Sequence, residues 1–204
     1  MGPSVQELHR SSGTKAPAHA VREARSSWRL LGGSSRALAL GAAVACVAVS
    51  AWWLPSTLRV LGTACALLAL VAAAVVDVVQ QRLPNVIVGS AAPPVAFTLV
   101  AAWEPSLVRS VATGALLMAV PLLVTHLATP SGMGFGDVKA GLVLGAALGL
   151  VDGQLALLAL VVGLAAGALW GLTRRARAVP LGPALVLGAI AALAVGRLLG
   201  VEVR

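Results

Sequence analysis

The sequence contains few acidic residues and few charged residues of any kind. Of its 204 residues, 7 are Asp or Glu, 11% are charged and 59% are hydrophobic. Soluble domains are about one-quarter charged and about half apolar, so this balance excludes an ordinary soluble domain and indicates an integral membrane protein. The net charge of +8 could suggest a nucleic-acid partner. However, the basic residues occupy a tail and short segments between apolar runs, which is the pattern of membrane proteins, so we expect no nucleic-acid binding.

Cysteine is also scarce. Cys46 and Cys65 are the 2 cysteines, and each lies inside an apolar run. This excludes a CxxC zinc pattern and a disulfide framework. No group of His, Cys and carboxylate residues has zinc-ligand spacing either. We therefore expect packing roles for both cysteines, and neither a metal nor another cofactor.

The distribution of apolar residues predicts an all-α, polytopic membrane protein with about seven transmembrane helices. Residues 1–36 are polar and basic without a hydrophobic stripe, which predicts a disordered cytosolic tail. Residues 37–204 form the predicted transmembrane domain, with its core at 60–200. Its helices are expected at 37–54, 60–76, 86–103, 110–129, 138–151, 154–172 and 183–200. Three prolines, Pro93, Pro94 and Pro121, fall within these segments and are expected to kink the helices or make space for their neighbours.

The basic residues predict the orientation in an inner or plasma membrane. With the tail inside, the inner segments hold 11 of the 15 basic residues, while Arg59, Arg109, Arg197 and Arg204 fall outside. This asymmetry favours a cytosolic N-terminus and an external C-terminus. It also places Asp77 and Asp137 on the cytosolic side.

These two aspartates are the candidate functional residues. Asp77 ends the second helix in "AAAVVDVVQQRLPN", and Asp137 opens the fifth in "GMGFGDVK". An ionisable side chain at the edge of the hydrocarbon is costly unless it serves a site, a pair or the interface. Asp137 could equally cap its helix, whereas capping poorly explains an anion at the C-terminal end of a helix, where Asp77 lies.

Folding that brings the two carboxylates together would give them acid and base roles. Neighbouring carboxylates in a low-dielectric site share a proton, so the ionised one activates water while the protonated one polarises a peptide carbonyl. Gly134 and Gly136 suit this site because glycine tolerates unusual φ and allows a substrate backbone to approach closely. A flexible interhelical turn explains the same glycines equally well.

Three motifs resemble those of the type IV prepilin peptidases. "GMGFGDVK" matches the GxGD signature, "DVVQQRLPN" is similar to the second catalytic-aspartate motif through Leu83 and Pro84, and "VPLGPALVLGA" at 179–189 is similar to the entry of the last helix. The resemblance implies a membrane aspartyl endopeptidase that removes the basic leader of prepilins or pseudopilins at the cytosolic face. It further implies that Asp77 and Asp137 are catalytic.

The resemblance also implies site-shaping or substrate-binding roles for Gly134, Gly136, Leu83, Pro84 and Lys139. Lys139 could lower the pKa of a neighbouring group or contact lipid phosphate, but a positive-inside anchor is the favoured interpretation over a catalytic role. The same preference for a structural over a catalytic role applies to Arg82, Arg174 and His126. The histidine could simply hydrogen-bond between helices.

Two departures from the family pattern narrow the hypothesis. The chain lacks the cysteine-rich insert of the larger members, which puts N-methyltransferase activity in doubt. Asn85 replaces an Asp found in many members, which resembles the short, peptidase-only forms of tight-adherence pili.

Other functions remain open at this stage. Presenilin-like enzymes share GxGD but require a Tyr-Asp motif, and this chain has 0 tyrosines. A small proton- or ion-coupled transporter that uses Asp77 and Asp137 is a non-enzymatic alternative. An inactive family member that acts as an assembly factor is another.

Overall fold

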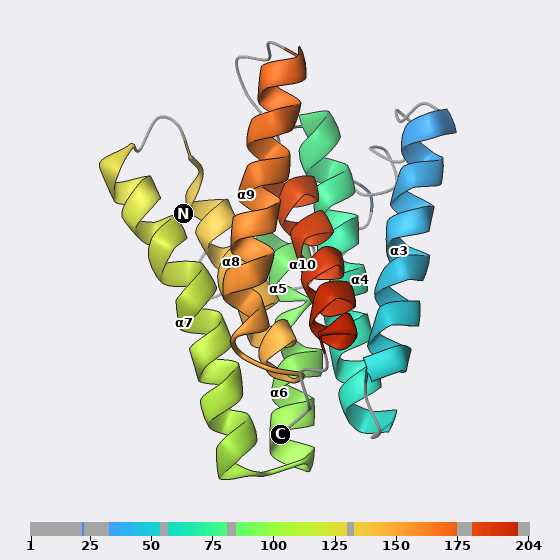
Figure 1. The fold of residues 1–204 in the computed structure, drawn as a ribbon, viewed down its shortest axis with the longest axis vertical. Helices are drawn as coiled ribbons and strands as arrows, with labels where there is room; N and C mark the ends of the chain where they lie inside the picture. The colour runs from blue at the N-terminus through green and yellow to red at the C-terminus, as the bar shows by residue number, and fades with distance from the viewer. Residues whose placement is uncertain are drawn as a thin grey trace, which may run out of the picture.

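The structure, a computed structural model, describes residues 22, 33–53, 57–80, 85–129, 133–174 and 181–199. Within these ranges every regular element is a helix, as the sequence predicts. Most of the predicted tail, 1–36, lies outside the described residues. The helices, which Figure 1 labels, are α3 (Gly33–Trp53), α4 (Thr57–Gln80), α5 (Asn85–Gly89), α6 (Ala92–Ala101), α7 (Pro105–Ala128), α8 (Phe135–Gly149), α9 (Leu155–Arg174) and α10 (Leu181–Leu198).

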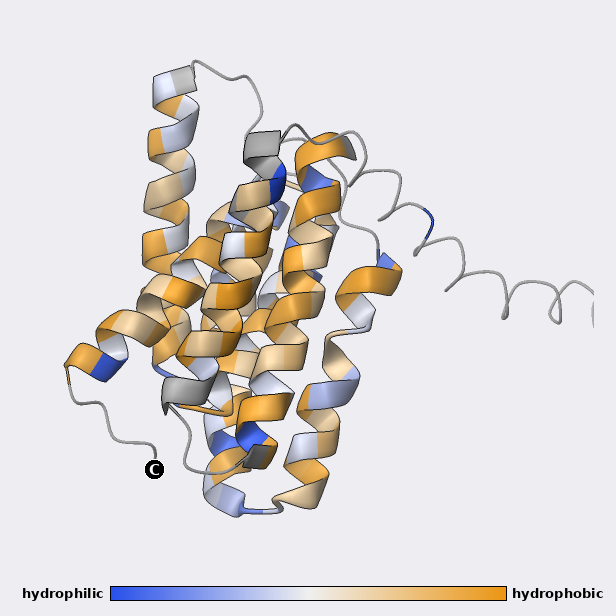
Figure 2. Ribbon diagram, turned by 90° about the vertical axis from the view of Figure 1, so that its right-hand side faces the viewer, coloured by the Kyte–Doolittle hydropathy of each residue, from blue (hydrophilic) through white to orange (hydrophobic). Residues whose placement is uncertain are grey.

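Four helices of the described chain are long and apolar enough to cross a membrane: α4, α7, α9 and α10. Large apolar side chains cover their outer surfaces; Leu127, Leu172 and Leu198 are each at least 70% exposed. A soluble protein rarely exposes so much apolar surface, whereas lipid solvates it without cost. Figure 2 shows hydrophobic residues through the middle of the bundle and hydrophilic ones gathered toward its ends. The protein is therefore a multi-pass membrane protein.

Helix α4 forms the centre of the bundle. It packs against α3, α5, α6, α8 and α10. In the apolar, membrane-spanning stretch of α4, 61% of the residues are buried. The corresponding share is 33% for α7 and for α9, which lie at the periphery. A group on the inner face of α4 is consequently shielded from lipid by several neighbours.

The connections alternate the helix directions, so that six helix ends meet at one end of the bundle. This end is at the top of Figure 1. It contains the C-terminal ends of α4, α7 and α9 and the N-terminal ends of α3, α8 and α10. The opposite end carries an ion pair between Arg59 and Glu104, with 2.8 Å between Arg59 Nη2 and Glu104 Oε2. The sequence-based interpretation assigned these same two residues to one side of the membrane.

The segment predicted as one helix at 86–103 is divided in two. Helix α5 ends at Gly89, a turn follows at Ser90 and Ala91, and α6 then begins with Pro93 and Pro94 in its first turn. Proline suits this position because the amide it lacks would have no intrahelical partner there. The prediction of a single helix over 86–103 was therefore wrong, whereas Pro93 and Pro94 do lie within a helix, in the first turn of α6 and not in its interior. Pro121 does lie inside α7.

Candidate active site

Asp77 lies in the last turn of α4 and is almost fully enclosed. Its exposure is 6%, and it is one of 4 buried polar residues in the described chain. The backbone N–H of Gly182, in the first turn of α10, donates a hydrogen bond to Asp77 Oδ2 at 3.0 Å. The aspartate therefore faces the protein interior and an adjacent helix N-terminus.

Asp137 lies in the first turn of α8 and is half-buried. Its backbone N–H donates to the Gly134 carbonyl at 3.1 Å, and its carboxyl in turn accepts a hydrogen bond from the Gly134 backbone. An acidic residue three positions after the N-cap, bonded back to the cap residue, is one half of a capping box. The predicted capping role is thus present. This capping bond leaves the other lone pairs of the Asp137 carboxyl available to other partners.

Helix packing brings the two aspartates to the same place. A small void is lined by Ala73 of α4, Ala140 of α8 and Gly182 of α10. Asp77 lies one turn beyond Ala73, and Asp137 lies one turn before Ala140, and residues one turn apart share a helix face. Because α4 runs toward this end of the bundle and α8 runs away from it, both aspartates lie about one turn from this void, on the side of the same bundle end.

The electrostatics of Asp137 agree with this arrangement. Asp137 lies outside the four helices that are long enough to cross the membrane. Burial raises the pKa of its carboxyl above the usual range, and the negative charge of Asp77 raises that pKa further. The Gly134 backbone and the charge of His126 act in the opposite direction. Asp77 therefore lies close enough to Asp137 for its charge to act on the Asp137 carboxyl.

The backbone of Gly134 does not need glycine for its conformation. Its φ of −74° and ψ of 144° are accessible to any residue, so the predicted unusual φ was wrong at this position. The residue is exposed, and a Cβ added there would lie 3.5 Å from Asp137 Oδ2. A larger side chain would project beside the carboxyl. Glycine at this position leaves the approach to Asp137 open. This agrees with the second reason that the sequence suggested for a glycine, which was close approach of a substrate backbone. Gly136 lies in the first turn of α8 and is half-buried.

Lys139 connects the two aspartate motifs. Its Nζ donates to Oδ1 of Asn85, the first residue of α5, at 3.3 Å. It also lies 5.2 Å from the ring centroid of Phe135. A cation over an aromatic face is worth about 0.5–1 kcal/mol at an exposed site. Lys139 thus joins the segment after Asp77 to the helix of Asp137 and lies at the rim of the site.

His126 holds the segment that leads into α8. Its Nδ1 lies 2.8 Å from the carbonyl oxygen of Met133, and its ring centroid lies 5.6 Å from that of Phe135. The predicted hydrogen bond is therefore present. It is made to the backbone that precedes α8, so His126 contributes to the position of the GxGD turn.

Two other predicted site residues cannot be placed relative to the aspartates, and one residue near Asp77 was not predicted. Leu83 and Pro84 lie between α4 and α5, outside the described residues. Gly182 was not predicted as a functional residue, although the motif at 179–189 contains it. Its proximity to Asp77 arises from a contact between residues 105 positions apart, which no local pattern specifies.

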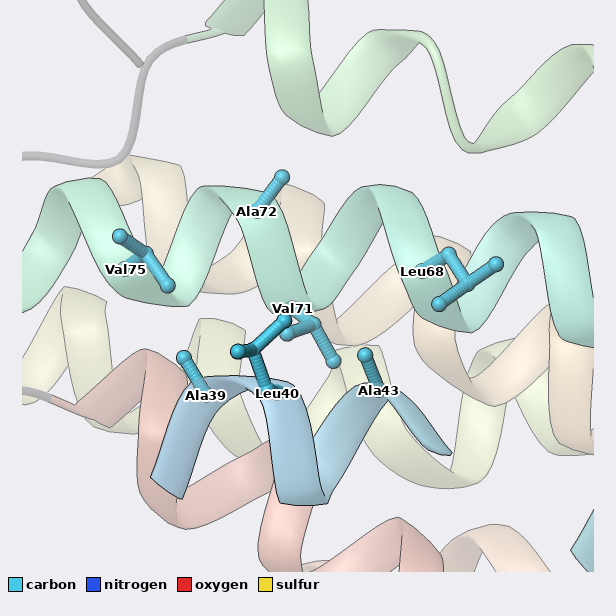
Figure 3. A pocket seen from close by; sticks show the side chains of 7 residues that line it. All are labelled: Ala39, Leu40, Ala43, Leu68, Val71, Ala72 and Val75. Atoms are coloured by element: carbon cyan, nitrogen blue, oxygen red, sulfur yellow. The ribbon is translucent and has the colours of Figure 1, made fainter. Parts of the chain in front are cut away.

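A hollow larger than the void near the aspartates lies elsewhere in the described bundle. It measures about 240 Å³ and lies between α3 and α4, lined by Ala39, Leu40, Ala43, Leu68, Val71, Ala72 and Val75. Figure 3 shows these apolar side chains, which present no acid, base or nucleophile to the hollow. It is not where the polar chemistry of the chain is concentrated.

Comparison with known proteins yields one match. The family model of the type IV leader peptidase family matches residues 63–172. That range includes Asp77, Asp137 and Lys139, and ends before α10. No curated protein and no solved structure matches the chain.

Proposed function

Because this chain belongs to the type IV leader peptidase family and is a membrane peptidase of that kind, we propose that it is an aspartic endopeptidase with Asp77 and Asp137 as its catalytic pair. Its substrate is a prepilin- or pseudopilin-like protein. Cleavage removes the short basic leader of that protein at the cytosolic face of the plasma membrane.

One observation carries this proposal: the two aspartates, from motifs 60 residues apart, each lie about one turn from the point where α4, α8 and α10 meet around one void, at one end of the bundle. Membrane proteins bury acids at such depth only where they are needed, because desolvation of a carboxylate is costly. Burying two carboxylates close together costs more free energy than burying one, because their negative charges repel.

The chemistry follows from one proton shared by two carboxyls. The ionised carboxylate takes a proton from water as the water oxygen attacks the scissile carbonyl carbon, and the protonated carboxyl donates its proton to the carbonyl oxygen. Collapse of the tetrahedral diol breaks the C–N bond: the carboxyl that holds the water proton protonates the leaving nitrogen, and the other carboxylate takes a proton from one diol hydroxyl as the new carboxylic acid forms. One carboxylate and one carboxylic acid are restored at the end of the cycle.

The surroundings of the pair are suited to an extended peptide. Gly134 is exposed and presents no side chain beside Asp137. The positive-inside asymmetry supports a cytosolic site, since Arg36, Lys139 and Arg174 belong to helix ends on the same side as the aspartates. A leader that carries basic residues would reach such a site without crossing the membrane.

The chain resembles the short, peptidase-only members. Asn85 stands where many members have Asp, and it accepts a hydrogen bond from Lys139. Together with the absence of a cysteine-rich insert from the sequence, this supports peptidase activity without N-methylation of the product.

Co-expression with a model substrate tests the proposal. The substrate is a short protein with a basic leader, then Gly, then a hydrophobic helix with Glu near its start. We expect a gel shift and, by mass spectrometry, one new N-terminus directly after the Gly. Asp77→Asn and Asp137→Asn variants, expressed at equal levels, should leave the substrate intact. A wild-type protein that does not cleave, but conducts protons into liposomes, would instead identify a transporter.

A further inference from the structure

The hydrogen bond between Gly182 and Asp77 assigns different environments to the two aspartates. Gly182 N–H lies in the first turn of α10, where backbone N–H groups have no intrahelical acceptor. Such groups carry partial positive charge and stabilise a nearby anion. Asp77 itself ends α4, where its own helix dipole disfavours a negative charge. The N-terminus of α10 therefore supplies the N–H donor and partial positive charge that the C-terminal end of α4 cannot supply.

The contact depends on the absence of a side chain at position 182. A Cβ there would lie 3.0 Å from Asp77 Oδ2 and 3.4 Å from the Cα of Ala74. The first distance is tighter than almost all real Cβ contacts, and both neighbours belong to the central helix. Gly182 is buried. Glycine thus allows the start of α10 to approach α4 closely enough for its N–H to reach the carboxylate.

The nearby lysine of α8, Lys139, does not supply Asp77 with an equivalent contact. Among the elements that pack against α4, the described ionisable residues at this end are Asp137 and Lys139 of α8 and Arg36 of α3. Helices α5, α6 and α10 carry none there. Lys139 is directed to Asn85 and Phe135. Asp77 is almost fully enclosed, and a buried carboxylate is costly unless a hydrogen-bond donor such as the Gly182 amide compensates it.

We propose that Gly182 is a positioning residue of the active site: its backbone N–H holds the Asp77 carboxylate ionised and oriented toward water, which leaves Asp137 as the proton-donating acid. This inference rests on the proposed aspartic peptidase function. It divides the two roles between the aspartates and adds a residue beyond the matched family range of 63–172.

The test compares Gly182→Ala with Gly89→Ala, a matched control at which an added Cβ meets no atom within 4 Å. In Gly182→Ala the carboxylate is displaced and its hydrogen bond weakened. We expect kcat to fall roughly 10- to 100-fold with little change in KM, because a hydrogen bond to a charged group and about 1 Å of displacement each have effects of this size. The acid limb of the pH–rate profile should also move to higher pH, since the ionised form loses a stabilising donor. Gly89→Ala should match wild type in both respects.

A second measurement does not depend on the folding of the variant. In ¹⁵N-glycine-labelled protein in detergent micelles, the Gly182 amide proton should resonate downfield and shift as pH is changed. That titration should disappear in Asp77→Asn. The inference is overturned if wild type cleaves while Gly182→Ala keeps its kcat and pH profile, or if the Gly182 amide is indifferent to Asp77→Asn. Absence of cleavage by wild type would count against the proposed function alone, because the amide titration still reports on the contact.

Discussion

At the scale of single residues, the two aspartates differ in their relation to helix ends. Asp137 lies near the N-terminus of α8, where its carboxyl bonds back to Gly134, and this structural role is compatible with the proposed chemical one. Asp77 lies at the C-terminal end of α4, and the Gly182 N–H of α10 donates a hydrogen bond to its carboxyl. Because each carboxyl has a hydrogen-bond donor, replacing either by an amide keeps an acceptor oxygen and removes only the proton cycle.

The first prediction concerns this pair. Asp77→Asn and Asp137→Asn should each reduce cleavage by about 100-fold or more, because each removes an acid/base group. Thermal stability should stay near wild type, since the amide oxygen still accepts the Gly182 or Gly134 bond. The double variant should be no worse than either single one, because residues that act as one unit are non-additive. Retention of more than about a tenth of wild-type cleavage by one Asn variant would exclude that residue from the pair.

The second prediction concerns Gly134. An Ala there adds a Cβ in ordinary contact with Asp137 Oδ2, at 3.5 Å, in a backbone conformation that Ala adopts freely. Gly134→Ala should therefore be as stable as wild type and lose little activity. Gly134→Val, which projects further over the carboxyl, should lose roughly 10-fold or more in kcat/KM at unchanged stability, by obstructing the substrate. Peptide cleavage and thermal unfolding, measured on both variants, check this. Equal activity of the Val variant would show that no substrate passes beside Gly134.

At the scale of helices, glycines set the distances that place the site. Where α7 crosses α8, a Cβ on Gly114 would meet the Gly145 carbonyl oxygen, and one on Gly145 would meet the Gly114 carbonyl oxygen. Small residues let membrane helices approach closely and gain dispersion energy that lipid-exposed side chains do not provide. The same close approach recurs where Gly188 of α10 contacts Ala159 of α9. These contacts hold α8 and α10 in place, and thereby the two groups that face Asp77.

The third prediction tests that packing. Gly145→Ala should lower stability by about 1–3 kcal/mol, because its Cβ would lie 2.8 Å from the Gly114 carbonyl carbon and 3.0 Å from Met118 Cβ, and overpacking has a cost of this size. Gly41→Ala in α3 is the control: an added Cβ meets nothing within 4 Å, and Ala favours the helix, so stability should be equal or higher. Thermal unfolding in one detergent compares the two. An unchanged midpoint for Gly145→Ala would show that α7 and α8 separate at no cost.

At the scale of the whole molecule, alternating helix directions sort the polar groups between two ends. The aspartates, His126 and Lys139 lie at one end, while the ion pair of Arg59 and Glu104 lies at the other. Glu104 is 55% exposed in its side chain, and an exposed pair of this kind contributes about 0–1 kcal/mol. The pair is therefore more informative about topology than about stability.

The fourth prediction tests the orientation. In a Cys65→Ala background, a cysteine at exposed Thr173, near the end of α9, should react with an impermeant maleimide only after the membrane is permeabilised. One at exposed Gln154, between α8 and α9, should react in intact cells. The parent without an added cysteine is the control, since Cys46 is buried. The reverse labelling pattern would place both aspartates on the external face and remove the proposed access for a cytosolic leader.

The local patterns of the sequence were sufficient to predict much of this protein. Apolar length located the helices, because each must match the hydrocarbon thickness whatever its neighbours are. The residues around Asp77 and Asp137 indicated the family, which the match at 63–172 confirms. The division of 86–103 at Ser90 and Ala91, just before Pro93 and Pro94, was missed because proline is equally compatible with a helix start and with a kinked interior.

Tertiary structure alone decided what surrounds each aspartate. The bond from Gly182 to Asp77 joins residues 105 positions apart, and the bond from Lys139 to Asn85 joins residues 54 positions apart. No period or motif specifies such contacts, because they depend on how closely neighbouring helices approach. That approach is set by where glycines of different helices meet, as at Gly114 and Gly145. The sequence by itself thus determined the family and predicted which residues carry the acid/base chemistry, and packing decided which backbone amide bonds to Asp77.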